Sequence, residues 1–197
     1  MNRNLLILGS GGYGTVVKEI ALEMNSFQRI DFLDDRYGIG ANGYHEEPIG
    51  KIGDMALFAG EYSFAVIAIG NPEVRINLLR KIEEETLFKI PAIISPRAYV
   101  SPSAQVQRGA VIEPLAGIHA NTIIGAASYI SMGAIVNHNA IVSEGCHIDI
   151  GAAVMSGAFV KPKTKAEAHA VIRSENFSLC GQVWNYKNSC LITFYAE

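Results

Sequence analysis

The feature that most constrains this chain is a six-residue repeat that begins at Ile94. Counted in sixes from there to Val160, twelve successive positions all carry isoleucine or valine. Four places after each of them stands a small residue, such as Ala98 or Cys146. An α-helix has no period of six, whereas a triangular parallel β-helix uses one hexapeptide per face, with the branched residue inward and the small one at the corner. We therefore predict a parallel β-helix of four eighteen-residue coils.

The open flank of such a prism has to be buried. Prisms of this kind generally associate as trimers, which creates clefts between subunits. The repeat therefore also predicts a homotrimer. It explains Cys146 as well, because this residue occupies a small inward position and is expected in the core rather than as a nucleophile.

A different pattern precedes the repeat. An apolar run from Leu5 to Leu8 is followed by glycines and then by apolar residues at helical spacing, which predicts a strand, a turn and a helix. The glycines Gly9, Gly11 and Gly14 form a G-x-G-x-x-G pattern. Such a turn lets backbone N–H groups at the helix start approach a phosphate, although glycine turns also occur for packing alone.

Two further strands complete the prediction for this α/β region. The strand "RIDFLDD" ends at Asp34 and Asp35, about twenty residues beyond the glycines, where Rossmann-like folds place an acid against a nucleoside. The alternative is a solvated strand end. A third strand ends at Gly70, and Asn71 with Pro72 opens a helix. This is half of a dinucleotide fold, so we expect a Rossmann-like domain for a single nucleotide over residues 1–93.

Composition excludes several classes of partner. The formal net charge is −3, the pI is near 6.0, and lysine and arginine form no run, which argues against nucleic acid and against a charged membrane surface. No apolar run is long enough for a membrane span or a signal peptide. The three cysteines show no metal-ligand spacing. We expect a cytoplasmic protein that acts on small molecules.

Two histidines in "VNHNAIVSEGCHI" are candidates for chemistry. His138 is the third residue of its hexad and stands over the small residues Ala120 and Ser156, so it faces outward. Its flanking amides, Asn137 and Asn139, can orient the ring, and we interpret it as a general base rather than as an ordinary solvated histidine.

His147 is the sixth residue of its hexad, with Tyr129 and Lys165 one coil away on either side. The nine residues between His138 and His147 are half a coil, so we do not expect the two to converge within one chain, although they can meet across a subunit interface. The spacing to His119 does not suggest three convergent ligands, so no metal is expected.

At this point the chain resembles a known family, the hexapeptide-repeat sugar acetyltransferases whose N-terminal domain binds a nucleotide sugar. This family includes the bacillosamine-type UDP-amino-sugar N-acetyltransferases and the sialic acid O-acetyltransferases. The resemblance covers about residues 4 to 160. It rests on "GSGGYG", "FLDDR", "IAIGNPEVR", "IISPRAYVSPSA" and "VNHNAIVSEGCHIDIGA". The fold that it implies is a left-handed β-helix after an α/β domain.

The resemblance implies a role for each matching residue. The nucleotide of a UDP-sugar is held by Gly12, Tyr13, Gly14, Asp34, Asp35 and Gly70. His138, oriented by Asn139, takes the proton from the attacking sugar amine or hydroxyl. His147 contacts acetyl-coenzyme A, in a cleft between neighbouring protomers of a trimer. Acetyl-coenzyme A is then a co-substrate, and no metal is required.

Several positions depart from the family pattern. Tyr13 replaces a histidine between the glycines, Asn139 replaces the acid that follows the catalytic histidine, and Ser131 replaces an asparagine in the preceding hexad. Where other members offer a glycine amide to the thioester, this chain has Ser156, with Gly157 one place later. An amide at position 139 gives the imidazole less basicity than a carboxylate does.

The largest departure follows Val160, where the six-residue count stops and an aromatic, apolar segment begins. We place the β-helix domain at 94–165 and an atypical C-terminal tail or cap at 166–197. Three explanations are open: a truncated or disrupted coding sequence, a cap over the open prism end, or a paralogue that has lost acyl transfer. Four aromatic residues suit a cap: Trp184, Tyr186, Phe194 and Tyr195.

The sequence thus favours an acetyl-coenzyme A-dependent acetyltransferase that acts on a nucleotide-activated amino sugar for surface glycan synthesis. A non-enzymatic nucleotide-sugar-binding protein, or a truncated paralogue without the acyl-coenzyme A site, is the alternative. A zinc-dependent hydratase on the same prism is a third class, which predicts bound metal and no use for the first domain.

Overall fold

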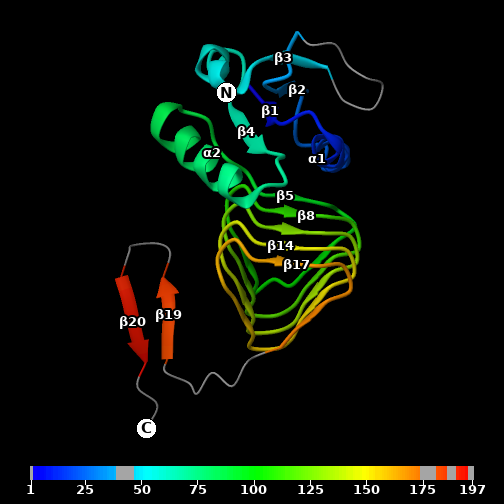
Figure 1. The fold of residues 1–197 in the computed structure, drawn as a ribbon, viewed down its shortest axis with the longest axis vertical. Coiled ribbons are helices and arrows are strands. Elements are labelled where there is room, and N and C mark those ends of the chain that lie inside the picture. The colour runs from blue at the N-terminus through cyan, green and yellow to red at the C-terminus, as the bar shows by residue number, and fades with distance from the viewer. Residues whose placement is uncertain (1, 39–46, 174–180, 186–189, 195–197) are drawn as a thin grey trace.

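The computed structural model describes residues 2–38 and 47–173, and the backbone of 181–185 and 190–194. An α/β domain lies on one end of a triangular prism of short strands, as Figure 1 shows. The two parts share an extensive contact, in which helix α1 (Gly12–Glu23) packs on the first strand of the prism, β5 (Ile93–Ile94).

A parallel four-stranded sheet forms the centre of the first domain. Its order is β3-β2-β1-β4, built from β1 (Asn4–Leu8), β2 (Arg29–Leu33), β3 (Pro48–Gly50) and β4 (Phe64–Ile67). A 3-10 helix, η1 (Ile52–Phe58), follows β3. Strands β1 and β4 are almost fully apolar because both faces of the sheet are covered. The Rossmann-like prediction for this region is confirmed.

Helix α2 (Pro72–Glu85) begins where the sequence predicts it. The Asn71 side chain accepts hydrogen bonds from the backbone N–H groups of Glu73 and Val74, at 2.9 and 3.2 Å, and Pro72 follows as the first helical residue. The loops that follow β1 and β4 lie at the same edge of the sheet, because adjacent parallel strands end there. This edge is where such folds bind nucleotides.

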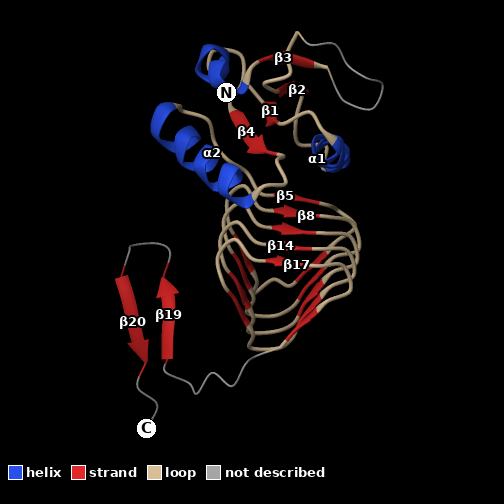
Figure 2. Cartoon of the chain, in the orientation of Figure 1, coloured by secondary structure: helices blue, strands red, loops and turns tan. Residues whose placement is uncertain are grey.

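The prism consists of three parallel sheets, drawn as short red strands in Figure 2. The first sheet contains β5, β8 (Val111–Ile112), β11 (Tyr129–Ile130), β14 (His147–Ile148) and β17 (Lys165–Ala166). The second contains β6 (Tyr99–Val100), β9 (Gly117–Ile118), β12 (Ile135–Val136), β15 (Ala153–Val154) and β18 (Val171–Ile172). The third contains β7 (Gln105–Val106), β10 (Ile123–Ile124), β13 (Ile141–Val142) and β16 (Phe159–Val160).

The hexad phase is the one that the sequence predicts. Strands eighteen residues apart pair directly, so that Val136 lies between Ile118 and Val154. These branched residues form one continuous apolar core with the small corner residues, among them Ala134 and Cys146. Burial raises the pKa of the Cys146 thiol to about 11, as expected for a core residue. The left-handed β-helix prediction is confirmed.

From Gly109 onward, one corner position in each hexad has a positive φ, between 52° and 69°. These residues are Gly109, Leu115, Asn121, Ala127, Gly133, Asn139, Gly145, Gly151, Gly157, Lys163 and His169. Glycine and asparagine adopt this left-handed conformation at the lowest cost. Asn139 belongs to this series, so the amide that replaces the family's acid also suits the backbone.

The β-helix extends further than the predicted boundary at residue 165. Strand β17 includes Ala166, and β18 adds a further face at Val171–Ile172. Ala166 interrupts the branched series, which makes the repeat end too early in the sequence, yet its side chain still points inward and is only 5% exposed. Similarly, Ile93 belongs to β5 and therefore to the prism.

The segment beyond residue 173 contains an antiparallel pair, β19 (Gly181–Asn185) and β20 (Cys190–Phe194). The proposed capping role of Trp184, Tyr186, Phe194 and Tyr195 concerns side chains that lie outside the described residues.

Candidate active site

The glycine loop has the geometry of an anion-binding turn. Gly9 has a φ of +109°, and a Cβ on Gly14 would lie only 2.3 Å from the Gly9 carbonyl oxygen, so both positions require glycine. Gly11 is the N-cap of α1 and provides no side chain to cap the first N–H groups. Those groups, at Gly12 and beyond, are therefore available to a phosphate.

Asp34 stabilises this loop through hydrogen bonds to Ser10. Its Oδ2 atom accepts hydrogen bonds from the Ser10 backbone N–H at 2.8 Å and the Ser10 hydroxyl at 3.1 Å. The Arg36 guanidinium donates to both carboxylate oxygens at 3.0 Å. Arg36, opposed by partial burial, is the main reason that the pKa of Asp34 lies well below its usual range. Asp34 therefore orders the loop, while half of the Arg36 side chain remains exposed beside it.

Asp35 follows β2 and Gly70 follows β4, so both lie at the carboxyl edge of the sheet. The Asp35 side chain is exposed, and one of its oxygens accepts a hydrogen bond from the Ile52 backbone N–H at 3.3 Å. Gly70 is exposed too, with its carbonyl fixed by the Arg75 guanidinium at 2.9 Å. Of the two predicted acids, Asp35 is the one with a carboxylate facing solvent.

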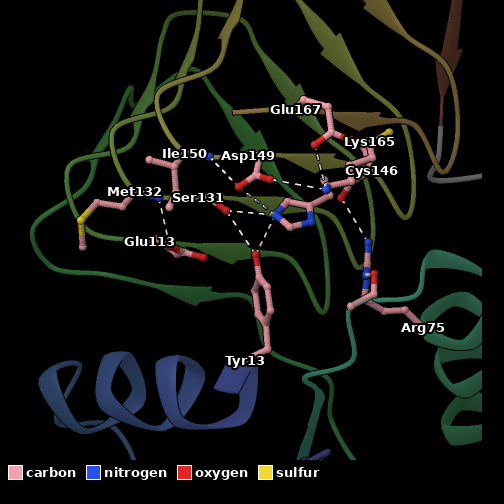
Figure 3. A network of polar contacts seen from close by, with 12 residues as sticks. Tyr13, Arg75, Glu113, Ser131, Met132, Cys146, Asp149, Ile150, Lys165 and Glu167 are labelled. Carbon is pink, nitrogen blue, oxygen red and sulfur yellow. Dashed lines mark hydrogen bonds and ion pairs between the residues drawn. The ribbon is translucent and has the colours of Figure 1, made fainter. Parts of the chain in front are cut away.

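His147 lies at the junction of the two domains, between Tyr13 of the glycine loop and Ser131 and Asp149 of the prism. Figure 3 shows these three side chains. The Nε2 atom of His147 is 2.7 Å from the Tyr13 hydroxyl and 3.1 Å from the Ser131 hydroxyl. The two hydroxyls are 3.2 Å apart and close a triangle. Asp149 is 3.9 Å from the same nitrogen. Tyr13, predicted as a nucleotide ligand, thus joins the glycine loop to the predicted acyl-coenzyme A residue within one chain.

Burial dominates the electrostatics of this junction. It lowers the pKa of His147, an effect that Asp149 opposes, so the ring is neutral at pH 7. Burial also raises the pKa of Tyr13 far above neutral pH. Glu113 is 9% exposed and accepts a hydrogen bond from the Met132 backbone N–H at 2.9 Å. Desolvation raises the pKa of its carboxyl, and this increase is partly offset by the Met132 N–H and then by the Ser131 and Tyr13 hydroxyls.

His138 has a contrasting environment on an open corner. Its ring is exposed, and Nδ1 is 3.1 Å from the Asn139 amide nitrogen. The Asn121 amide donates to the Asn139 carbonyl oxygen at 3.2 Å, and the Asn137 side chain accepts from the His138 backbone N–H at 2.7 Å. His119 lies close by, with its ring centroid 5.9 Å from that of His138. The flanking amides therefore contact His138 as predicted.

A groove of about 540 Å³ runs beside this corner. It is lined by Arg97, Tyr99, Leu115, Ala116, Gly117, His119, Ile135 and Asn137. Three of these side chains, Tyr99, Leu115 and Ile135, are apolar and more than half exposed. The second sheet therefore presents an apolar outer surface next to His138.

The two predicted amide donors, Ser156 and Gly157, follow β15. The Gly157 N–H donates to the His138 carbonyl at 3.1 Å and is therefore used within the prism. Within the described residues, the Ser156 backbone N–H has no such acceptor. Ser156 is thus the better candidate to donate to a ligand, one coil above His138.

The predicted residues fall into three groups: the glycine loop with Asp34, Asp35 and Gly70, the interdomain cluster of Tyr13 and His147, and the corner of His138, Asn139 and Ser156. No contact joins His138 to His147 among the described residues, as the half-coil spacing predicts. Three further residues, Arg36, Arg75 and Glu113, belong to the site but are not predicted from the sequence. Arg36 and Arg75 are the last residues of the motifs "FLDDR" and "IAIGNPEVR", which was the available signal, whereas no motif includes Glu113.

Two other expectations concern metals and membranes. Among residues 2–38 and 47–173, no group of three or more His, Cys, Asp or Glu side chains could hold a metal ion. None of the helices in the described part of the chain is long and apolar enough to cross a membrane.

Comparison with known proteins supports both parts of the architecture. Residues 4–82 match the PglD N-terminal domain family. The chain is 29% identical over 115 residues to UDP-N-acetylbacillosamine N-acetyltransferase from Bacillus subtilis (strain 168). That match covers 56% of this chain and 51% of the relative, so it spans about half of the relative's length.

Solved structures extend the likeness over both domains. The acetyltransferase domain of PglB from Neisseria gonorrhoeae FA1090, in complex with acetyl coenzyme A, has a TM-score of 0.71 at 28% identity and covers 88% of this chain and 89% of its own. A mutant of GDP-perosamine N-acetyltransferase from Caulobacter crescentus, in complex with CoA and GDP-perosamine, has a TM-score of 0.74 at 23% identity, with coverages of 87% and 89%. At that identity, the latter supports the fold alone.

An α/β domain that matches the PglD N-terminal domain family, followed by a hexapeptide β-helix, gives this chain the architecture of the PglB acetyltransferase domain. The resemblance predicted from the sequence is confirmed. More particularly, its first domain is of the PglD N-terminal type. The relative from Bacillus subtilis is named as an N-acetyltransferase, and the acetyltransferase domain of PglB was solved with acetyl coenzyme A.

Proposed function

We propose that this protein is an acetyl-coenzyme A-dependent acetyltransferase that acts on the amine of a UDP-linked amino sugar. One observation carries the proposal: Tyr13, at the start of α1 in the nucleotide-binding loop, contacts His147 of the β-helix directly, at 2.7 Å. A nucleotide sugar held by that loop therefore extends toward the prism, where an acyl donor binds. O-acetylation is the variant within the same class.

The first domain holds the nucleotide. Backbone N–H groups of Gly12, Tyr13 and Gly14 face the diphosphate at the positive end of the α1 dipole. Asp35 and Gly70 line the nucleoside side of the pocket, while Asp34 orders the loop through Ser10. The exposed part of Arg36 adds a positive charge beside the same loop.

His138 acts as the general base, oriented by Asn139. A protonated amine cannot attack a thioester, so the imidazole removes the proton as the amine nitrogen bonds to the carbonyl carbon. The carbon–sulfur bond then breaks, and the coenzyme A thiolate leaves with the proton that the imidazole returns. In the structure the nitrogen of the Asn139 amide faces Nδ1, so this role requires the amide to be reversed. Its oxygen then accepts from Nδ1–H, and the lone pair of Nε2 faces the substrate.

The acyl-coenzyme A site is shared between protomers of a homotrimer, with His147 and Ser156 as its contacts on this chain. The exposed apolar residues of the second sheet, including Tyr99 and Ile135, support burial against a neighbouring copy. Such an interface would bring His138 of one copy toward the interdomain cluster of another. An acyl-coenzyme A donor and the free thiol of Cys146 fit a cytoplasmic protein of surface glycan biosynthesis.

Isothermal titration tests this proposal directly. The full-length protein is titrated with acetyl-coenzyme A and, separately, with UDP-N-acetylglucosamine as the probe for a UDP-amino sugar. Binding of both is the expected result, followed by acetyl transfer to a UDP-linked amino sugar. Binding of the nucleotide sugar without acetyl-coenzyme A would reject the acetyltransferase in favour of a nucleotide-sugar-binding protein or an enzyme that lacks its acyl site.

A further inference from the structure

Tyr13 is held by a column of flat groups that crosses the domain boundary. Its ring stacks on that of Tyr129, with centroids 4.8 Å apart and planes inclined by 20°. On Tyr129 lies the guanidinium of Arg75, 4.1 Å from the ring centroid. The Tyr129 hydroxyl donates to the Ile67 carbonyl at 2.6 Å. The ring of Tyr13 is therefore packed against Tyr129, and its hydroxyl points toward His147.

Arg75 anchors the base of this column. The side chain is fully buried, and all five of its hydrogen bonds within the described chain go to backbone carbonyl oxygens. The acceptors are Ala127, Ile69, Gly70, Gly145 and Cys146. Because these carbonyls belong to both domains, Arg75 fixes the position of the first domain on the prism.

The far end of the column occupies one nitrogen of His147. Two hydroxyls, those of Tyr13 and Ser131, lie within 3.1 Å of Nε2, which leaves no room for a ligand there. Within the described chain, no hydrogen bond is made by Nδ1. His147 can therefore meet a bound molecule only through Nδ1.

The proton inventory favours one arrangement of the cluster. A neutral ring carries a single proton, and the tyrosine hydroxyl keeps its own because burial disfavours the phenolate. If the Tyr13 O–H donates to Nε2, the Ser131 O–H remains for the Glu113 carboxylate, which also accepts the Met132 N–H. The two hydroxyls, the carboxylate and Nε2 then all have partners, and the ring proton is on Nδ1, which is left to donate to a ligand.

We propose that Tyr13 is the positioning residue of His147: its hydroxyl occupies Nε2 and fixes the ring proton on Nδ1, where His147 donates a hydrogen bond to the carbonyl oxygen of an acyl thioester. This inference rests on the proposed acyl transfer and assigns a chemistry to its acyl site. As the amine adds to the carbonyl carbon, negative charge develops on that oxygen, and a donor placed there in advance stabilises it. Through Tyr13, which is part of the nucleotide-binding loop, the column links the position of that loop to the position of the His147 donor.

Nitrogen-15 NMR of the full-length protein, labelled on histidine, tests the tautomer without any need for activity. The shifts of the ring nitrogens distinguish a protonated from an unprotonated atom, and His147→Gln assigns the signal among the five histidines. The expected result is a neutral His147 with its proton on Nδ1. A proton on Nε2, with Tyr13 donating instead to Ser131 or Glu113, would overturn the proposal whatever the protein catalyses.

The variant Tyr13→Phe keeps the ring stack and removes the hydroxyl. We expect it to give His147 a mixture of tautomers and to lower kcat by roughly 10- to 100-fold, with little change in KM for the nucleotide sugar. The matched control is Tyr62→Phe, which removes another buried tyrosine hydroxyl of the same domain, the one that donates to Asp31 at 2.7 Å. Equal tautomer populations in wild type and Tyr13→Phe would refute the positioning role.

A KM effect alone, with kcat and tautomer unchanged, would also refute the positioning role and would leave Tyr13 as a nucleotide ligand. If the protein shows no acetyl transfer at all, the proposed function fails, while the tautomer measurement still decides whether Tyr13 fixes the His147 proton.

Discussion

His138 and His147 lie nine residues apart on one repeat, yet the structure gives them opposite environments. His147 is covered by the first domain and its Nε2 is held by two hydroxyls, whereas His138 is exposed on a corner among amide side chains. The repeat places both on the prism surface, but only one of its three sheets is covered by the α/β domain. The domain contact, rather than the hexad position, therefore determines the chemistry of each imidazole.

Removal of the exposed imidazole is expected to have the largest effect on kcat. His138→Ala should lower kcat by roughly 10²- to 10⁴-fold, the usual contribution of a positioned general base, with little effect on nucleotide-sugar affinity. Steady-state kinetics measure this loss. His119→Ala, which truncates the neighbouring exposed imidazole, should cost far less. A full rate in His138→Ala would mean that the buried site, not the exposed one, handles the proton.

The second test weakens the contact between the two domains that buries His147. Arg75→Met leaves backbone carbonyls of both domains without their donor and should destabilise the protein by about 2 to 4 kcal/mol. Urea denaturation measures the change. Arg80→Met is the matched control, because Arg80 is largely exposed and its only ion pair in the described chain, with Glu144, spans 3.9 Å. Equal stability of the two variants would contradict the anchoring role of Arg75.

A third test uses the pH dependence of stability. Burial lowers the pKa of His147 in the folded state, so between that value and about 6.5 the unfolded chain binds more protons than the folded one. The free energy of unfolding should therefore fall as the pH drops below about 6.5, by at most about 1.4 kcal/mol per pH unit from this group. Denaturation of wild type and His147→Gln at several pH values measures the effect. If both show the same slope over this window, His147 is not the buried group responsible.

The smallest expected effect is on kcat and comes from a change beside the exposed His138. Asn139→Asp places a carboxylate against Nδ1 of His138 and should raise kcat at pH 7 by less than about tenfold, since a carboxylate supports a general base better than an amide. Asparagine and aspartate both tolerate the positive φ of 58° at this corner. Asn137→Asp adds the same charge on the other side of His138 without facing Nδ1, and serves as the control. A gain in both variants would indicate a general effect of charge.

The sequence was sufficient for the prism, because a period of six repeated twelve times fixes which residues point inward. It also located the glycine loop and the opening of α2, where Gly14 and Asn71 have unmistakable local roles. It could not locate the contact between the domains. Glu113 has the appearance of a solvated outward residue in its hexad, and Arg75 that of an ordinary helix residue, since burial by a distant segment leaves no mark on local periodicity.

The end of the β-helix shows the same limit in another form. Ala166 is a poor match to the isoleucine and valine series, yet the backbone of β17 pairs with β14 in register. Pairing with the coil below is enough to continue the prism when the inward side chain is merely small. A boundary drawn from side-chain identity alone was therefore placed too early.

The left-handed corner in every sixth residue has a consequence for how this gene can change by insertion and deletion. Loss of a single codon between His138 and His147 would shift every later residue by one place, so that inward side chains would turn outward. Ala152 and Ala158 would then occupy the positive-φ corners of Gly151 and Gly157. Only the gain or loss of a whole eighteen-residue coil keeps both the corners and the three faces in phase. Even that change is restricted near His147, because a coil inserted below it would carry the imidazole one strand spacing, about 5 Å, beyond the reach of Tyr13.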